Sequence, residues 1–441
     1  MSGPGTGPAG DVSVAGPGRS PSLWRNGDFL RLWTGETVSV FGSQVSQLAI
    51  PLAAARVLRA SPAEFGLLSA LEMLPFLLLA LPAGVWVDRL RRRPVLIGGD
   101  LVRVLALGCI PLTYLSGHLS MAVLYAVALV AGSATVFFDV AYQSYLPVLV
   151  ERDQLVEGNG KLEVTRSASQ VAGPGIAGFL VGLLTAPVAV LLDALSFLFS
   201  ALMLLLIRRP EPSPVAHPGA PRGMRAEMAE GLAVIVRNPL LRGIAACTAT
   251  SNFFSSLAFA VFILFAVDEL RLSDAAIGLV FAFGSVGGLL GAVISSRVPA
   301  RLGIGRTLEA AILIQALAGL LAPLAQPATA FPLLVAAQFG FAISNPVYNV
   351  TQVSLRQSIT PHRLQGRMNA TMRFLVWGVM PLGSLAGGAV ATVLGVRGAV
   401  AVGAAGALLA VVPLALTPIH RLHDPPPAWR DERDGAANEE G

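Results

Sequence analysis

The stretch GVWVDRLRRRP, residues 84–94, places four arginines and one aspartate between two long apolar runs. Of the 441 residues in the chain, 54% are hydrophobic and only 13% are charged, whereas a typical soluble protein has about 25% charged residues. Apolar runs of about 20 residues are long enough to cross a bilayer. The stretch therefore predicts a short basic connector between two membrane-spanning helices.

Similar apolar runs recur along the chain and predict an all-α membrane protein with twelve transmembrane helices. We expect the spans at residues 32–55, 65–87, 95–115, 121–149, 164–184, 187–207, 240–267, 275–296, 307–326, 330–355, 369–394 and 399–419. The longest connector, 208–239, divides the chain into two six-helix halves, 23–207 and 240–419. We expect residues 1–22 to be a disordered tail and residues 420–441 to be a second tail.

Arginines lie mostly in the even-numbered connectors, after spans 2, 4, 6, 8 and 10. The odd-numbered connectors are short and poor in bases, with Arg56, Arg59 and Arg271 as the exceptions. The positive-inside rule therefore predicts that the even connectors and both termini are cytoplasmic, in a bacterial inner membrane. The connector 208–239 also predicts an amphipathic helix on the cytoplasmic membrane surface. Its apolar face carries Met224, Met228, Leu232 and Ile235.

The two halves carry matching sequence features. DVAYQ (139–143) in span 4 corresponds to NPVYN (345–349) in span 10. Each segment is followed by an expected polar turn, QLVEGN ending at Asn159 and RLQGRMN ending at Asn369, and then by a glycine-rich helix. Repeated halves of this kind are typical of secondary transporters.

Polar side chains form a stripe along one face of spans 1, 4, 7 and 10, the first helix of each three-helix unit. A polar stripe on a membrane helix must face another helix or a water-filled space. Four stripes at this period favour one shared substrate cavity, and ordinary hydrogen bonding between helices is the alternative. We expect the cavity to be lined by Glu36, Ser43, Gln47, Asp139, Tyr142, Gln143, Asn252, Asn345, Tyr348, Asn349, Gln352 and Arg356.

Energy coupling by ATP is not indicated, because the sequence has no phosphate-binding loop of the G-x-x-x-x-G-K-S/T type. Acids and bases spaced i, i+3 on a helix are expected to neutralise each other. Two such pairs occur, Asp100 with Arg103 and Glu163 with Arg166. Glu36, Glu72, Asp139 and Asp193 have no such partner. Glu36 and Asp139 lie on the polar stripes, so they are the candidates for proton coupling, whereas we expect Asp193 to bond to a neighbouring helix.

After span 2 of twelve, residues 84–94 resemble the signature loop of the major facilitator superfamily, and the resemblance covers about residues 24–419. It implies a latch in which Asp88 meets the cytoplasmic end of span 11 when that side of the protein is closed. A carboxylate is favoured at a helix N-terminus. The second half has Ser295 in the equivalent place, so we expect the latch on one side only. The latch residues are Gly84, Asp88, Arg89, Arg92 and Arg93, with Arg367 as a partner.

Span 5 contains a glycine motif that resembles the one found in exporter branches of this superfamily, formed by Gly173, Pro174, Gly175 and Gly178. The whole chain is most similar to the enterobactin-exporter and macrolide-efflux branch. The resemblance implies export of amphipathic drugs, natural products or siderophores by proton antiport, and an importer or facilitator of a small nutrient or metabolite is the alternative.

We expect a monomer whose partners are a small-molecule substrate, the lipid bilayer and protons, with no cofactor and no metal. The sequence shows no arrangement of nucleophile or metal ligands typical of an enzyme. Its arginines lie in loops beside apolar runs rather than on one basic face, which argues against a nucleic-acid partner.

Overall fold

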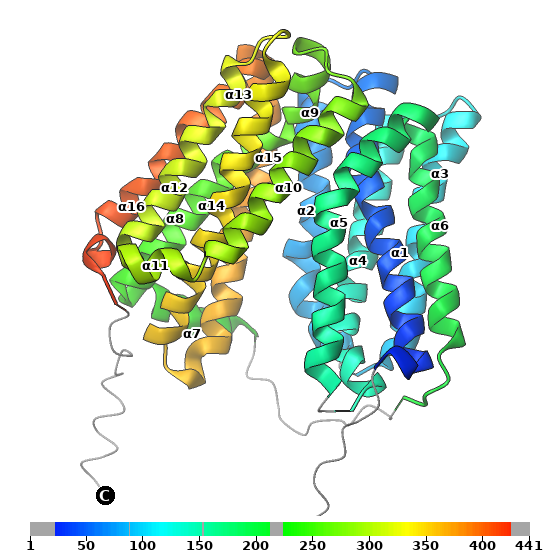
Figure 1. Ribbon diagram of the computed structural model, residues 1–441, viewed down its shortest axis with the longest axis horizontal. Helices are drawn as coiled ribbons and strands as arrows, with labels where there is room; N and C mark the ends of the chain where they lie inside the picture. Colours follow the sequence, from blue (N-terminus) through cyan, green and yellow to red (C-terminus); the bar gives the residue numbers. More distant parts are fainter. Residues whose placement is uncertain (1–22, 88, 152–153, 212–223, 425–441) are drawn as a thin grey trace, which may run out of the picture.

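The computed structural model describes residues 23–87, 89–151, 154–211 and 224–424. All regular elements among these residues are helices, arranged as two bundles side by side (Figure 1). Eleven helical stretches are long and apolar enough to cross a membrane. The last of them, Leu364–Ala415, breaks at Gly395, where φ is 76°, so it supplies two spans and the twelve-helix fold is confirmed.

The helices of the N-terminal half are η1 (Leu23–Arg25), α1 (Gly27–Leu52), the π-helical η2 (Ala53–Val57), α2 (Pro62–Val87), α3 (Arg92–Leu115), α4 (Met121–Leu149), α5 (Leu155–Leu184) and α6 (Ala186–Leu206). Helix α1 begins at Asn26, whose side-chain oxygen accepts hydrogen bonds from the backbone N–H groups of Asp28 and Phe29. This N-cap satisfies two of the donors that a helix start leaves without partners.

The connector contributes α7 (Met224–Arg237). The C-terminal half follows with α8 (Pro239–Ala260), α9 (Phe262–Leu264), the π-helical η4 (Phe265–Glu269), α10 (Asp274–Ile294), α11 (Arg297–Leu302), α12 (Ile304–Gly319), α13 (Leu321–Leu324), α14 (Ala330–Ile359), α15 (His362–Ala407), η5 (Leu408–Ala410), α16 (Val411–Ala415) and η6 (Pro418–Arg421). Structure therefore continues to residue 424, past residue 420 where the sequence predicts a tail; the expected tail residues 1–22 and 425–441 lie outside the described residues.

The two expected polar turns are helical, and that prediction was wrong. Helix α5 begins at Leu155 and runs through Asn159, whose side-chain amide donates to the carbonyl of Leu155. An ion pair one turn apart, Lys161 Nζ to Glu157 Oε1 at 3.2 Å, adds local support. In the second half, α15 likewise begins at His362 and includes the other expected turn. Both segments are therefore helical although glycine there lowers helix propensity.

The first span of each half ends in the same irregular turn. The π-helices η2 and η4 are equivalent in the repeat, and each is followed by an arginine with positive φ, Arg59 at 49° and Arg271 at 56°. The fourth spans are also equivalent, and they end at Leu149 of α4 and Ile359 of α14. Measured from these ends, the matching segments DVAYQ and NPVYN differ in depth by one helical turn, so the polar stripes keep their faces.

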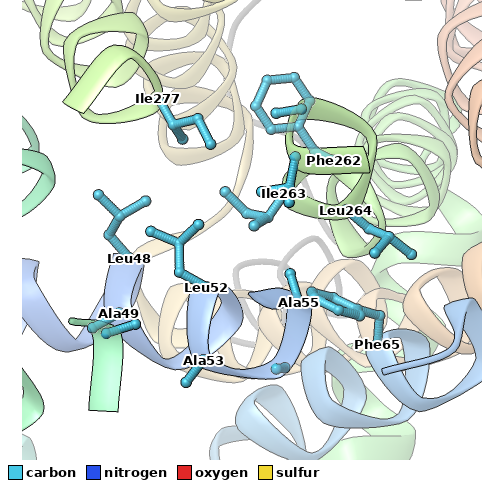
Figure 2. Packing of buried hydrophobic residues seen from close by; sticks show 14 of the residues in the cluster. Leu48, Ala49, Leu52, Ala53, Ala55, Phe65, Phe262, Ile263, Leu264 and Ile277 are labelled. Atoms are coloured by element: carbon cyan, nitrogen blue, oxygen red, sulfur yellow. The ribbon is translucent and has the colours of Figure 1, made fainter. Parts of the chain in front are cut away.

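The two ends of the bundle pack differently. We call the end with connectors 58–61, 116–120, 270–273 and 325–329 the short-loop end, and the end with α7 and α11 the linker end (Figure 1). At the short-loop end one buried apolar core contains side chains of both halves. Figure 2 shows Leu52 of α1 pointing toward Ile263 of α9 within this core. At the linker end, among the described residues, each half has its own core.

Two pairs of glycines let helices of opposite halves touch. A Cβ on Gly66 of α2 would lie 2.9 Å from the Cα of Gly388 of α15, and a Cβ on Gly178 of α5 would lie 2.9 Å from the Cα of Gly278 of α10. Side chains larger than hydrogen are excluded at such crossings because they would overlap the facing backbone. The two crossings are related by the repeat and join the halves next to the shared core.

Helix α7 is attached to the C-terminal half. A Cβ on Gly231 would lie 2.7 Å from the backbone carbonyl oxygen of Arg367, in the first turns of α15. Val234 and Ile235 are buried in the core of the C-terminal half, whereas Leu232 and Val236 are exposed. Leu232 and Ile235, expected on one apolar face, therefore have different surroundings, because α7 divides its apolar side chains between the protein and the outside.

Candidate functional site

Four carboxyl groups of the N-terminal half interact electrostatically with the guanidinium of Arg103 on α3. They come from four different helices and are Glu36 of α1, Asp100 of α3, Asp139 of α4 and Asp193 of α6. Asp100 and Asp193 are buried, Glu36 is half-buried and Asp139 is exposed. We call these five residues the acid cluster.

Arg103 is held firmly inside the acid cluster. Its Nη2 lies 2.6 Å from Asp100 Oδ1, which confirms the pair predicted from the i, i+3 spacing. Its guanidinium carbon also lies 4.1 Å from the ring centroid of Phe138 and 4.0 Å from that of Phe197. Two aromatic faces and one carboxylate stabilise the buried charge.

Asp193 ties α6 to α1. Its Oδ1 accepts hydrogen bonds from Ser196 Oγ at 3.1 Å and from Ser43 Oγ at 3.4 Å. The expectation that Asp193 bonds to a neighbouring helix is confirmed. Ser43, expected to line the cavity, uses its hydroxyl in this bond between helices.

The remaining two acids of the cluster have basic neighbours that the sequence did not reveal. Arg166 of α5 acts electrostatically on Glu36 and Asp139, and Arg373 of α15, in the other half, acts on Asp139. The predicted pair of Arg166 with Glu163 was wrong: both side chains are exposed, and no ion pair joins them in the described structure. The i, i+3 rule fails here, and Arg166 acts electrostatically on acids of two other helices, α1 and α4.

One aromatic residue of the predicted cavity lies beside the acid cluster. The ring of Tyr142 stacks on Phe138 with centroids 5.8 Å apart and planes 16° apart. Its hydroxyl is buried and has no hydrogen-bond partner among the described residues. Gln143 and Gln47, expected on the same stripes, are exposed. Tyr142 is therefore an unused donor and acceptor next to Glu36 and Asp139, both of which act on it electrostatically.

In the C-terminal half, three amides of α14 form a ladder. Asn349 Nδ2 donates to Asn345 Oδ1 at 2.9 Å, and Gln352 Nε2 donates to Asn349 Oδ1 at 3.4 Å. Gln352 is only 4% exposed, and its Oε1 has no partner among the described residues. One turn further, the Nε of half-buried Arg356 is also without a partner in the described structure. The ladder and Arg356 thus contain one buried acceptor and one buried charged donor without a partner among the described residues.

Two other expected cavity residues serve the packing of the C-terminal half. The hydroxyl of Tyr348 lies 2.7 Å from Thr248 Oγ1 and donates to Cys247 Sγ at 3.3 Å, and the residue belongs to the buried core of this half. Asn252 Nδ2 donates to the carbonyl of Val376 on α15 at 2.7 Å. Both bonds join α8 to its neighbours, the alternative that the stripes left open.

The arginines of the signature loop fasten the linker end of the N-terminal half. The backbone N–H groups of Arg92 and Arg93 donate to the carboxylate of Glu211 at 2.6 and 3.1 Å. The guanidinium of Arg93 donates to the carbonyls of Leu204 and Leu205 at the end of α6. The other latch residues are an exposed Arg89, Gly84 with open space around its Cβ position, Arg367 at the start of α15, and Asp88, which lies outside the described residues.

The glycine motif of span 5 lies on two packing surfaces of α5. Gly173 faces the side chain of Gln44 on α1, within its own half. The carbonyl oxygen of Pro174 and the backbone of Gly178 meet Gly278 of the other half, and a Cβ on Gly175 would lie 3.6 Å from Ala282. The motif therefore places α5 between α1 and α10.

The described residues contain no group of three or more His, Cys, Asp or Glu side chains arranged to hold a metal ion. The acid cluster thus combines negative charge with aromatic rings, and the amide ladder consists of neutral hydrogen-bonding groups. They belong to different halves, α1, α3, α4 and α6 on one side and α14 on the other.

Comparisons with known proteins agree with this architecture. The chain matches the family model of the Major Facilitator Superfamily over residues 32–382 and 245–438. It is 24% identical to macrolide efflux protein A of Streptococcus pyogenes, over 84% of this chain and 90% of the relative. It is 27% identical to the multidrug efflux pump Tap of Mycolicibacterium fortuitum, over 74% of this chain and 80% of the relative. A crystal structure of a bacterial homologue of the iron transporter ferroportin, in an inward-facing state, has the same fold with a TM-score of 0.71 at 18% identity, covering 90% of this chain and 99% of that chain.

Proposed function

The chain belongs to the major facilitator superfamily and is a multi-pass membrane transporter, and from that premise we propose that it exports amphipathic small molecules by alternating access in exchange for protons. Two of its relatives are named as efflux proteins for macrolides and for multiple drugs. The observation that carries the proposal is the acid cluster, in which four carboxyl groups from four helices interact electrostatically with the guanidinium of Arg103 and Asp100 is ion-paired with it.

The charges of the acid cluster do not balance. Asp100 is paired with Arg103, and Asp193 accepts hydrogen bonds from two serines, so both have fixed partners. Glu36 and Asp139 form no ion pair in the described structure, and the arginines Arg103, Arg166 and, for Asp139, Arg373 act on them only electrostatically. A charged group at the centre of a membrane helix costs roughly 2.5–3.5 kcal/mol on the insertion scale. A proton or a cationic group of the cargo can therefore stabilise each of these two carboxyls further.

Competition between a proton and a cargo for one carboxylate is a physical basis for antiport, because binding of either releases the other. The half-buried ring of Tyr142, which stacks on Phe138, adds an aromatic side chain beside these acids. The Tyr142 hydroxyl and the Gln352 side-chain carbonyl are buried without a hydrogen-bond partner among the described residues, so a cargo that reaches them gains a bond to each. An amphipathic amine with hydroxyl or carbonyl groups matches the acids, the aromatic ring and the two hydrogen-bonding groups.

The test uses inverted membrane vesicles from a host that lacks its own drug pumps, an imposed pH gradient, and ethidium and a macrolide as probes. Wild-type protein is expected to accumulate at least one probe when the vesicle interior is acidic. Glu36→Gln and Asp139→Asn should each reduce gradient-driven accumulation at least tenfold. Glu309→Gln, on α12 outside the acid cluster, is the matched control and should transport normally.

Full gradient-driven accumulation by both Glu36→Gln and Asp139→Asn would contradict proton coupling through these acids. Uptake in vesicles of native orientation, without a gradient, would instead favour a facilitator or importer. We also propose that the linker end is cytoplasmic and that the protein resides in a bacterial inner membrane, because the basic connectors lie at that end. A core shared only at the short-loop end, among the described residues, supports an inward-facing state.

A further inference from the structure

Arg56 and Asp274 form an ion pair that crosses from one half of the transporter to the other. Arg56 belongs to η2, at the end of the first span, and Asp274 is the first residue of α10. Arg56 Nε lies 2.6 Å from Asp274 Oδ1, and Arg56 Nη2 donates to the carbonyl of Leu272 at 2.7 Å. One guanidinium thus binds two groups of the opposite half.

The pair lies on the rim of the closed short-loop end. The backbone carbonyl of Asp274 lies 2.7 Å from the Cβ position of Gly178, at the crossing of α5 and α10. Ala53, Ala54 and Ala55, which precede Arg56 in η2, belong to the core shared by the two halves. The Arg56 side chain is 39% exposed and that of Asp274 is 18% exposed. The ion pair therefore lies at the exposed edge of the apolar core that the two halves share.

The contact has no counterpart in the repeat. Arg56 and Asp268 hold the same place in the π-helices η2 and η4, and Asp274 and Pro62 are the first residues of the equivalent helices α10 and α2. The counterpart of Arg56 is thus the acid Asp268, and the counterpart of Asp274 is the uncharged Pro62. These two residues cannot form a second ion pair related by the repeat. Arg56 was also an exception to the positive-inside rule, and a bond to the other half gives this arginine a role other than fixing the orientation of the chain.

We propose that Arg56 and Asp274 are gate residues of the short-loop end: their ion pair holds the two halves together there and breaks whenever the transporter opens to that side. The proposal rests on alternating access, the proposed mode of transport. An ion pair of this exposure stabilises one state only modestly. It therefore sets the balance between two states without trapping either of them.

A second ion pair at the same end provides a matched control. Arg397 Nε lies 2.9 Å from Glu269 Oε2, and both residues belong to the C-terminal half. Arg397 also donates to the carbonyls of Pro323 and Ala325 of the same half. Loss of this pair removes a comparable charge contact without loosening the boundary between the halves.

The first experiment measures the distance between spin labels on exposed connectors of the two halves, at Ser116→Cys and Ala328→Cys, after Cys109 and Cys247 are replaced by alanine. Arg56→Gln should raise the ratio of open to closed short-loop ends about two- to fivefold, the range that such a pair contributes. Arg397→Gln should leave the ratio unchanged. The exchanged pair Arg56→Asp with Asp274→Arg should return it toward the wild-type value.

An unchanged ratio in Arg56→Gln, or equal shifts in Arg56→Gln and Arg397→Gln, would overturn the proposal. This measurement needs no cargo, so it decides about the gate even if the proposed export activity is wrong.

The second experiment joins Arg56→Cys to Asp274→Cys with a short, cleavable bifunctional thiol reagent. The joined protein should lose ethidium transport and regain it when the reagent is cleaved. Normal transport by the joined protein would show that this contact does not open during the cycle. If wild-type protein moves neither ethidium nor the macrolide, the export proposal fails, and the spin-label distances of joined and unjoined protein still test the gate.

Discussion

Glu211 and His423 accept hydrogen bonds from the first backbone N–H groups of two equivalent helices, one in each half. Glu211 uses its side-chain carboxylate, whereas His423 uses its backbone carbonyl. The Glu211 carboxylate accepts a hydrogen bond from the backbone N–H of Arg92, the first residue of α3, at 2.6 Å. The backbone carbonyl of His423 accepts one from the N–H of Ile304, the first residue of α12, at 3.1 Å. In both halves the chain that leaves the last helix returns to the start of the third.

Replacement of Glu211 should therefore weaken the linker end of the N-terminal half. We expect Glu211→Ala to lower the free energy of unfolding by about 0.5–2 kcal/mol, the usual contribution of a helix cap. Thermal unfolding in detergent, followed by circular dichroism, measures this. Glu151→Ala removes an exposed ion pair with Arg209 and should cost at most about 1 kcal/mol. Equal losses in the two variants would argue against the capping role.

Substitutions in the signature loop should have two different effects, one on transport at Asp88 and one on stability at Arg93. If Asp88 forms the latch to span 11 that the family resemblance implies, Asp88→Asn should leave abundance and thermal stability intact and lower transport, because a latch of this kind needs the charge. Arg93→Gln should lower thermal stability, because two hydrogen bonds to the carbonyls of Leu204 and Leu205 are lost. Measurement of membrane abundance, Tm and probe transport on both variants tests this. Normal transport by Asp88→Asn would show that the acid has no part in the transport cycle.

The crossing of α5 and α10 should not tolerate a methyl group. The Cβ of Gly178→Ala would lie 2.7 Å from the backbone carbonyl of Asp274, so backbone must move. We expect a loss of about 1–3 kcal/mol in stability, the usual cost of overpacking. Gly182→Ala, one turn further along α5 with open space at its Cβ position, should be neutral. Differential scanning fluorimetry compares the two, and a stable Gly178→Ala protein would refute the close contact.

Removal of the charge of Arg103 should be more harmful than removal of the whole pair. Arg103→Gln leaves Asp100, which is 0% exposed, as a buried acid without its base, and we expect a loss of about 3–5 kcal/mol. The double variant with Asp100→Asn should recover part of this loss. Denaturation midpoints of the three proteins test the order, and a double variant less stable than Arg103→Gln would contradict it.

The proposed orientation predicts which thiols are reached from outside. In a protein without its own cysteines, Ser116→Cys at the short-loop end should react with a membrane-impermeant maleimide in intact cells. Arg301→Cys on α11, which is also exposed, should react only after the cells are permeabilised. The reverse pattern would invert the orientation.

Features that depend on residues close together in the sequence were predictable. Apolar runs gave the twelve spans, because the bilayer demands length and hydrophobicity from each helix alone. The pair of Asp100 with Arg103 followed from spacing on one helix. The glycines of span 5 were recognisable as a motif in the sequence, and Gly178 lies at a close helix crossing.

Features that depend on distant parts of the chain were missed. The sequence paired Arg166 with Glu163, but Arg166 acts electrostatically on Glu36 and Asp139 of other helices. Tyr348 was expected in the cavity because of its stripe, yet its hydroxyl meets Thr248 and Cys247 of α8. A helical wheel gives the polar face and cannot say which neighbour meets it.

The attachment of α7 to the C-terminal half gives the connector a definite reach. Glu211 is bound to the N-terminal half, and α7 begins at Met224, so only residues 212–223 lie between the two anchored points. At roughly 3.3–3.6 Å per residue, this segment extends about 45 Å at most. The connector thus sets an upper limit on how far the two halves swing apart at the linker end, whatever the cargo.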